Sequence, residues 1–348
     1  MICIRTLTGP SARPRRSPLR RVLALGLPTA WGATAITYKL ACPLAQQDGL
    51  GARLVSSAVF FAVGTGLVLH VRRTLLRELR QARRIAGVAQ SALLRPLPPS
   101  VGGLNVAAAQ LSADPGAVIG GDLYEVVGTE HGVRMVMGDA RGHGLAAVGT
   151  AAAVLGSFRE AVHDGDDLGD VLRRLDRALA RHVRERSRDG TAGEEFVTVL
   201  LLEIGSDGEV RTLNCGHPWP CLITGTEIEP LARTDPLPPL GLFPLPDDLP
   251  ADRHGRLLPG QALLLHTDGA EDARDGRGRF FPLRQILADA VREQPLCPRA
   301  VLHRVLTALL RHTHNSPPDD VALLMLHRDG TRALDDRSLA GHGADSLS

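Results

Sequence analysis

The chain has 348 residues, of which 44% are hydrophobic and 22% are charged, and its formal net charge is +2. This balance is typical of a folded protein, so bulk disorder is excluded, and the length allows one large domain or two modest ones. Lys39 is the only lysine, which excludes chemistry that needs a lysine on a phosphate or as a Schiff-base nucleophile. The five cysteines form no C-x-x-C pair, which argues against a disulfide framework or a zinc cluster.

The N-terminal part contains two apolar segments that lie between two arginine clusters. Val22–Ala45 carries Lys39 as its only charge, and Leu54–Val71 is interrupted only by His70. Both approach the length of about 17–25 residues that a membrane-spanning helix needs. A signal peptide is the alternative for the first segment, and two buried core helices are the alternative for both. We expect a basic tail at 1–20 and a two-helix transmembrane hairpin at 21–71.

The arginine clusters also predict an orientation. They flank the hairpin on one side, with Arg20 and Arg21 before it and Arg72 and Arg73 after it. By the positive-inside rule both ends then lie in the cytoplasm. We therefore expect a multi-pass protein of the plasma membrane with its catalytic domain in the cytoplasm.

Residues 72–95 predict a linker helix, because leucines such as Leu75, Leu79 and Leu93 recur on one stripe and Pro96 ends the pattern. Two interpretations stay open for this helix. One is a solvated linker, and the other is a regulatory stalk through which the chain would form a homodimer.

After Pro96 the pattern changes to short apolar segments separated by glycine and aspartate. Strands outnumber helices and come in hairpin-like groups, which favours an α+β fold of antiparallel sheets with helices packed outside. We place this domain at 96–328 and expect the tail at 329–348 to be disordered. The expected strands are Leu104–Gln110, Val133–Met137, Phe196–Ile204, Glu209–Asn214, Cys221–Ile223, Ala262–His266 and Val321–His327; the expected helices are Leu145–His163, Leu168–Arg188, Pro282–Glu293 and Pro298–His312.

Four acidic positions follow apolar or glycine-rich approaches at sharp turns. They are Asp122, Asp139, Asp268 and the pair Asp319-Asp320. Carboxylates at strand ends can converge in space, and converging carboxylates need cations to hold them together while ionised. Oxygen-only ligation selects magnesium or manganese over zinc. Two such ions can activate a water and orient it for in-line attack on a phosphoryl group, which predicts hydrolytic phosphoryl transfer.

Seven motifs occur in the order seen in the metal-dependent protein phosphatase (PPM, type-2C-like) family, and the chain most resembles its bacterial SpoIIE-like branch. These motifs are Gly120-Gly121-Asp122-Leu123-Tyr124, Gly138-Asp139-Ala140-Arg141-Gly142-His143-Gly144, Phe196-Val197-Thr198, Asn214-Cys215-Gly216-His217-Pro218, Pro239-Leu240-Gly241-Leu242, Thr267-Asp268-Gly269 and Asp319-Asp320-Val321. The resemblance implies two stacked antiparallel sheets flanked by helices, and two manganese or magnesium ions. It also implies hydrolysis of phosphoserine or phosphothreonine in proteins.

The resemblance also assigns roles to residues of this sequence. Asp122 and Asp139 would bind metal, the backbone carbonyl of Ala140 would complete one metal site, and Asp268 and Asp319 would hold the other. Asp320 is the second acid of its pair, whereas the family usually uses the first. Arg141 stands where relatives carry a histidine proposed as general acid, and its guanidinium could instead bind the substrate phosphate.

The expected activity is therefore that of a protein serine/threonine phosphatase, which uses a metal-activated water and acts on a phosphorylated regulatory protein such as an anti-sigma-factor antagonist. Two alternatives are a catalytically inactive, membrane-tethered binding module of the same fold and a metal-dependent phosphodiesterase. Nucleic acid is not expected as a partner, because no aromatic residues interleave the arginine-rich helix at 168–188. The motif Asn214–Pro218 reads as a structural turn after a strand.

Overall fold

The computed structural model describes residues 30–34, 37, 50–111, 121–142, 144–164, 167–188, 195–293 and 295–330. The chain divides into two compact units, Met1–Gln81 and Ala82–Ser348. The expected basic tail at 1–20, most of the first apolar segment, Gly120 and the C-terminal residues 331–348 lie outside the described residues.

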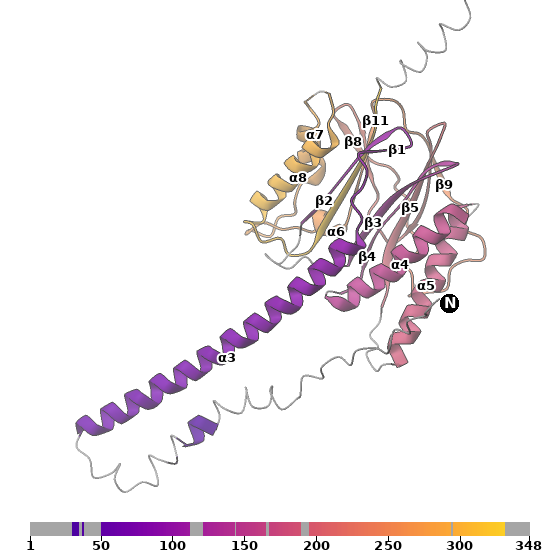
Figure 1. Ribbon diagram of the computed structural model, residues 1–348. Helices are drawn as coiled ribbons and strands as arrows, with labels where there is room; N and C mark the ends of the chain where they lie inside the picture. Colours follow the sequence, from indigo (N-terminus) through magenta and orange to yellow (C-terminus); the bar gives the residue numbers. More distant parts are fainter. Residues whose placement is uncertain are drawn as a thin grey trace, which may run out of the picture. The chain divides into compact units, whose positions relative to one another are not determined.

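The first unit contains most of a long helix, α3 (Leu50–Leu93), whose last turns belong to the second unit. The second apolar segment and the expected linker helix are continuous on α3 (Figure 1). Ser57–Arg77 is the one segment in the described part of the chain that is long and apolar enough to cross a membrane, and none of it is buried. Only residues 30–34 and 37 of the first apolar segment are described. One apolar helix is thus present, and the two-helix hairpin stays a prediction.

A contact between the two apolar segments is visible within this unit. The indole of Trp31 donates from Nε1 to the carbonyl oxygen of Phe60 at 3.3 Å, and the two ring centroids lie 5.4 Å apart. A Cβ at Gly64 would lie 3.5 Å from the same indole. The stretch around Trp31 therefore packs on α3.

The second unit contains two antiparallel sheets. The six-stranded sheet has the order β1-β2-β11-β10-β7-β8, and the five-stranded sheet has the order β3-β4-β5-β6-β9. The strands of the first are β1 (Ser100–Val101), β2 (Leu104–Leu111), β11 (Val321–Arg328), β10 (Ala262–His266), β7 (Cys221–Thr224) and β8 (Glu227–Pro230). Those of the second are β3 (Asp122–Thr129), β4 (Gly132–Ala140), β5 (Val197–Gly205), β6 (Glu209–Cys215) and β9 (Asp252–Arg256).

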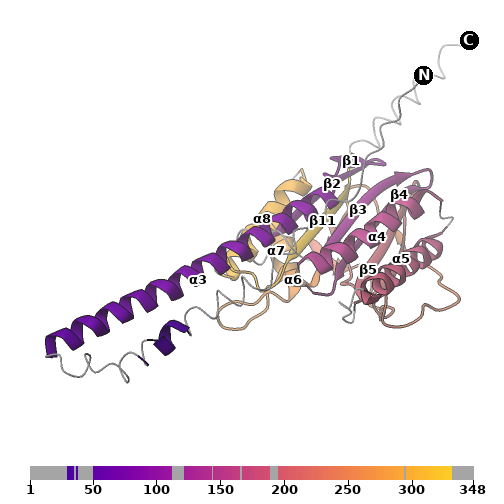
Figure 2. The same ribbon diagram turned by 60° about the horizontal axis from the view of Figure 1, so that its bottom comes forward.

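Helices cover the outer faces of both sheets (Figures 1 and 2). On the five-stranded sheet lie α4 (Leu145–Asp164) and α5 (Leu168–Arg188), and on the six-stranded sheet lie α7 (Leu283–Ala290) and α8 (Pro298–His312). A third apolar layer fills the space between the sheets, with Met137, Leu200 and Leu324 among its members. Burial of these three layers is what holds the sandwich together.

The expected α+β fold class is confirmed, with two antiparallel sheets and flanking helices, and each strand and helix expected after Pro96 is present. The helix expected at Pro282–Glu293 is shorter, at Leu283–Ala290. Five short or polar elements were not expected: β1, β3, β8, β9 and α6 (Asp268–Glu271). Two of these, β3 and α6, begin at candidate site residues.

Candidate functional site

Two of the candidate carboxylates lie opposite each other at one end of the five-stranded sheet. Asp122 is the first residue of β3, Asp139 is the penultimate residue of β4, and the two are paired in the antiparallel register. Met135 and Met137, at alternate positions on β4, belong to the core between the sheets. Because residues two apart on a strand share a face, both carboxylates point into the end of this inter-sheet space.

The six-stranded sheet brings the remaining acids to the same end. Asp268 begins α6, separated from the end of β10 only by Thr267, and Asp319-Asp320 directly precede β11. The end of β10 and the start of β11 lie side by side, because His266 pairs with Leu323.

Thr267 joins the two sheets at this end. Its amide donates to the carbonyl of Ala322 at 3.1 Å, and its Oγ1 accepts the amide of Ala322 at 2.9 Å. Its hydroxyl lies 3.3 Å from Oδ2 of Asp122 and donates to it. The carboxylate of one sheet is therefore held by a side chain of the other.

Two glycines allow the chain to approach the acids closely. A Cβ at Gly121 would lie 2.0 Å from the carbonyl oxygen of Ala140 and 2.5 Å from Oδ1 of Asp139. A Cβ at Gly269 would lie 2.0 Å from the carbonyl oxygen of Asp320. Such distances are forbidden to any side chain, which explains the glycine beside Asp122 and the glycine beside Asp268.

The acids interact electrostatically across the site. Burial raises the pKa of Asp122 well above its usual value, and the charges of Asp139, Asp320, Asp268 and Asp319 raise it further. Burial, followed by the charges of Asp268, Asp319 and Asp320, raises the pKa of Asp139 to about 7. The pKa of Asp268 is raised by burial and by Asp319. The structure thus brings all five acids into one repelling cluster.

The donor set suits hard divalent cations. Carboxylate and carbonyl oxygens are the ligands that magnesium and manganese prefer, and a cation relieves the repulsion that raises these pKa values. Among the described residues, no three or more His, Cys, Asp or Glu side chains are arranged to hold a single ion. Magnesium commonly keeps several waters and takes only one or two carboxylates. The residues therefore fit partly hydrated cations rather than an ion in a closed protein cage.

Ala140 and Arg141 lie at the edge of the cluster. Ala140 is buried, and its amide donates to the carbonyl of Gly121 at 3.0 Å. Arg141 is exposed, its amide donates to the carbonyl of Phe196 at 3.0 Å, and its guanidinium carbon lies 5.1 Å from the centroid of the Phe196 ring. The Arg141 side chain thus lies at the protein surface beside the acidic cluster.

Sequence reasoning missed a polar chain behind Asp139. Thr198, opposite Asp139 in the register, accepts the Asp139 amide at Oγ1 at 3.2 Å. The same Oγ1 lies 3.0 Å from Nδ1 of His217. Asn214 holds His217 in turn, accepting its amide at Oδ1 and donating from Nδ2 to its carbonyl, both at 2.8 Å. The signal was present in the sequence as two motifs, but nothing there indicated that they meet.

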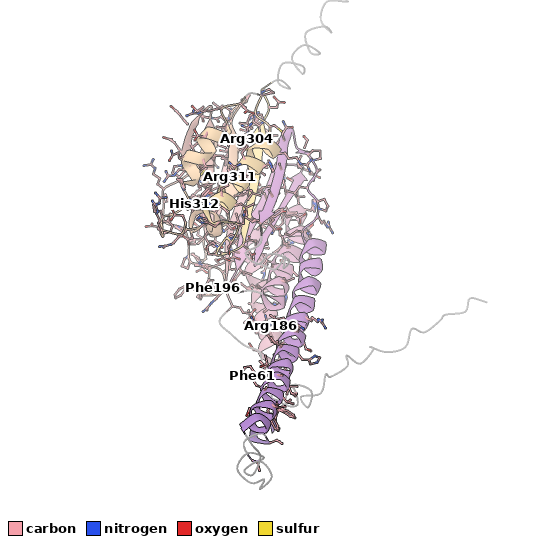
Figure 3. All side chains as sticks on the ribbon, turned by 90° about the vertical axis from the view of Figure 1, so that its left-hand side faces the viewer. Phe61, Arg186, Phe196, Arg304, Arg311 and His312 are labelled. Carbon is pink, nitrogen blue, oxygen red and sulfur yellow. The ribbon has the colours of Figure 1, made fainter. Side chains whose placement is uncertain are left out.

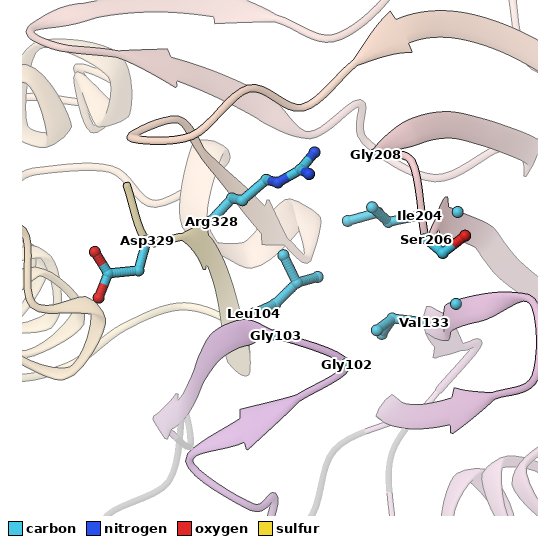
Figure 4. A pocket seen from close by; sticks show the side chains of 11 residues that line it. Gly102, Gly103, Leu104, Val133, Ile204, Ser206, Gly208, Arg328 and Asp329 are labelled. Atoms are coloured by element: carbon cyan, nitrogen blue, oxygen red, sulfur yellow. The ribbon is translucent and has the colours of Figure 1, made fainter. Parts of the chain in front are cut away.

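A separate cavity of about 310 Å³ opens at the other end of the sandwich (Figure 4). It is lined by the turns around Gly103, Gly132 and Gly205 and by Arg328, the last residue of β11. The acidic cluster lies beside the first residue of that strand, so this cavity is no part of the candidate site.

Comparisons with known proteins agree with this architecture. A profile of the Stage II sporulation protein E (SpoIIE) family matches residues 129–329. The SiaA-PP2C domain of Pseudomonas aeruginosa is 20% identical, with a TM-score of 0.59, over 73% of this chain and 99% of that one. The RsbU and RsbW domains of Rv1364c from Mycobacterium tuberculosis are 24% identical, with a TM-score of 0.51, over 70% of each chain. The PP2C phosphatase domain of SpoIIE from Bacillus subtilis, with a regulatory fragment, is 16% identical, with a TM-score of 0.50, over 65% of this chain and 63% of that one.

Proposed function

Because the chain belongs to the Stage II sporulation protein E (SpoIIE) family and has a PP2C-like fold, we propose that it is a metal-dependent protein serine/threonine phosphatase. The observation that carries this proposal is the convergence of Asp122, Asp139, Asp268, Asp319 and Asp320 from separate elements at one end of the sandwich. The repulsion between these carboxylates destabilises the fold, so a purely structural role does not explain the cluster. Binding of cations removes the repulsion and gives the cluster a function.

The proposed mechanism assigns distinct tasks to the acids and to Arg141. Asp122, Asp139 and the carbonyl of Ala140 would hold one divalent cation, and Asp268 and Asp319 the other, with Asp320 beside them. When bound, such cations supply an activated water and stabilise the charge on the phosphoryl oxygens. Thr267 keeps the Asp122 carboxylate directed into the site. Arg141, which stacks on Phe196, would bind and orient the phosphate of the substrate through its fork of N–H donors.

The proposed substrate is a phosphorylated cytoplasmic regulatory protein, such as an anti-sigma-factor antagonist. Support comes from the family and from likeness to the structure of SpoIIE, a cell fate determinant whose phosphatase domain was solved with a fragment of its regulatory domain. This step rests on analogy of fold rather than on contacts in the site.

We also propose that the chain is anchored in the plasma membrane with the phosphatase domain in the cytoplasm. Ser57–Arg77 has the length and composition of a membrane span, and Phe61 projects from it with 78% of its surface exposed (Figure 3). Trp31 packs against the same helix, as the first helix of a hairpin would. Arg72, Arg73 and Arg77 lie at the end that leads to the second unit, as the positive-inside rule requires of a cytoplasmic end.

The test is turnover by the purified full-length chain. With manganese present, we expect hydrolysis of p-nitrophenyl phosphate and of a phosphoserine peptide, with both activities abolished by EDTA. Hydrolysis of bis-p-nitrophenyl phosphate in preference to the monoester would show a phosphodiesterase instead. No turnover of any of the three, with manganese bound, would show the inactive binding module.

A further inference from the structure

The motif Asn214–Pro218 does more than make a turn. Gly216 has a φ of +70°, which only glycine adopts readily, so the turn expected from the sequence is present. The turn also carries a fully enclosed imidazole, because His217 is only 3% exposed. A turn after a strand needs no buried histidine.

The environment keeps this imidazole neutral. Burial, reinforced by the neighbouring His266, lowers the pKa of His217 to about 3. A neutral imidazole can accept at Nδ1, so the hydroxyl of Thr198 can donate to it while its oxygen accepts the amide of Asp139. The same hydroxyl lies 3.5 Å from the carbonyl oxygen of Asp139, so Thr198 contacts both main-chain groups of that residue as well as His217.

The position of His217 is fixed independently of Thr198. The two bonds from Asn214 clamp its main chain on both sides, at the amide and at the carbonyl. A main chain held at both its amide and its carbonyl has little freedom to move, whereas Nε2 of the ring is buried and has no partner among the described residues. Through Thr198 the held main chain of His217 constrains the backbone of Asp139, near the end of β4. Gly121 lies so close to Asp139 and Ala140 that the backbone there cannot shift toward it.

We propose that His217 and Thr198 are positioning residues that hold the end of β4 in the conformation in which Asp139 binds a divalent cation. The inference rests on the proposed function of the acidic cluster and adds two residues to it. Partners behind a ligating group typically change metal affinity by about 10–100-fold when they are removed. The groups required for this positioning are the hydroxyl of Thr198 and Nδ1 of His217.

The experiment measures binding of Mn²⁺ alone to the full-length chain, from the loss of the free-ion signal in electron paramagnetic resonance, together with the manganese dependence of p-nitrophenyl phosphate hydrolysis. Thr198→Val keeps the shape and removes the hydroxyl, whereas Thr198→Ser keeps the hydroxyl. His217→Gln places no polar atom where Nδ1 stands, whereas His217→Asn does. We expect T198V and H217Q each to raise the Kd for Mn²⁺ about tenfold or more. We expect T198S and H217N to stay within about threefold of the wild type, and kcat at saturating manganese to change little in all four.

His182 supplies the matched control. Its Nε2 is also buried without a partner among the described residues, but its ring lies beside Gly149 between α4 and α5. We expect His182→Gln to leave the Kd for Mn²⁺ unchanged. Thermal unfolding in EDTA identifies any variant that fails to fold.

The outcomes separate this inference from the proposed function. An unchanged Kd in T198V and H217Q, or equal losses in T198S and T198V, would overturn the positioning role while leaving the phosphatase proposal intact. A wild-type chain that binds no Mn²⁺ would overturn both.

Discussion

Under the proposed function, Asp139 has to meet two opposed requirements. Its carboxylate lies in a cluster that resists ionisation, yet ligation of a cation requires the ionised form. Burial and the neighbouring acids therefore make the apo site a source of instability near neutral pH, which a bound cation would remove. Function and stability should respond in opposite directions when one acid is neutralised.

The first prediction concerns activity. Asp139→Asn or Asp268→Asn should abolish manganese-dependent hydrolysis of p-nitrophenyl phosphate, by about 100-fold or more, because each removes a charged ligand of the proposed pair of cations. The fold should survive, since each substitution keeps the shape and reduces repulsion. Circular dichroism checks the fold, and activity within a few-fold of wild type in both variants at saturating manganese would contradict the two-metal assignment.

The second prediction concerns stability without metal. The folded-state pKa of Asp139, about 7, exceeds its ordinary value of 3.8, so between these values the folded state holds a proton that the unfolded state has lost. The contribution of Asp139 to the free energy of unfolding therefore falls as pH rises from about 4 to 7. At pH 8 in EDTA, Asp139→Asn should be more stable than wild type by about 2 kcal/mol. This is less than the free energy that corresponds to a pKa shift of about three units, because Asp139 is only partly buried and solvent screens its charge.

Denaturant unfolding of both proteins at pH 4.5 and pH 8 provides the measurement. The difference between variant and wild type is the relevant quantity, because the lowered pKa of His217 acts in the opposite sense, with stability lost as pH falls below about 6.5. If the difference in unfolding free energy between variant and wild type does not grow with pH, ionisation of Asp139 in the metal-free protein does not destabilise the fold.

The third prediction concerns the close approach at Gly121. Gly121→Ala would place a Cβ 2.0 Å from the carbonyl of Ala140, so the backbone that carries Asp139 must move. We expect metal-dependent activity to fall at least about tenfold and the unfolding free energy to fall by about 2 kcal/mol. Gly156→Ala, on α4 with nothing within 4 Å of the new Cβ, is the control and should be neutral or stabilising. Equal behaviour of the two variants would show that the approach at Gly121 is relaxed in solution.

Among the elements, those with a regular apolar pattern could be predicted from the sequence and those built on polar side chains could not. β5 and β11 are mostly apolar and were predicted nearly to their ends. β3 was missed because Asp122 and Glu125 interrupt its apolar pattern; one faces the inter-sheet site and the other pairs with Arg159 of α4. A strand whose polar residues are satisfied by partners distant in sequence has no local signature.

The same distinction applies to the site. The convergence of Asp122, Asp139, Asp268 and Asp319 could be expected from the sequence, because each lies beside glycine or proline at the end of an apolar segment. The relation of Thr198 and His217 to Asp139 could not be expected, because it depends on the register between β4 and β5 and on the path of the turn after β6. Spacing along the chain contains neither fact.

The fourth prediction concerns the attachment of α4 to the sheet. Arg134 of β4 is 2% exposed, its Nε lies 2.6 Å from Oε2 of Glu203 on β5, and its Nη1 donates to the carbonyl of Val162 in the last turn of α4 at 3.2 Å. The guanidinium thus joins two strands to a helix end, where a cation is favoured. Arg134→Ala should lower the unfolding free energy by about 3 kcal/mol, because Glu203 is then left buried with only the more distant Arg211.

The double substitution Arg134→Met with Glu203→Leu tests whether the loss of stability comes from the unpaired, buried charge of Glu203. Replacing both partners with apolar groups of similar volume removes that charge, so most of the lost stability should return. A double variant as unstable as Arg134→Ala would show that the bond to the end of α4, rather than the ion pair, is the essential contact.

At the scale of the whole molecule, the chain combines a PP2C-like sandwich with a helix, α3, much of whose apolar surface is exposed, although Trp31 packs against it at Phe60. Val59, Phe61 and Val63 on α3 are exposed by 55%, 78% and 45%. Burying an apolar side chain is worth about 1.5–3 kcal/mol. Val59 and Val63 share one side of the helix and Phe61 lies on the opposite side, so apolar surface is exposed on both sides. Apolar surface left in water favours aggregation, and insertion into a bilayer removes that cost.

The last prediction follows from this surface. The full-length chain should sediment with membranes and resist extraction by alkaline carbonate, whereas a fragment of residues 93–328 should remain in the supernatant. Val59→Arg with Val63→Arg should weaken retention, because a charge at the centre of a spanning helix costs about 2.5–3.5 kcal/mol, and Val59→Leu with Val63→Leu is the matched control that should stay bound. Fractionation of the wild-type chain with the soluble proteins would mean that the exposed face of α3 is covered by protein instead, as in a buried core helix.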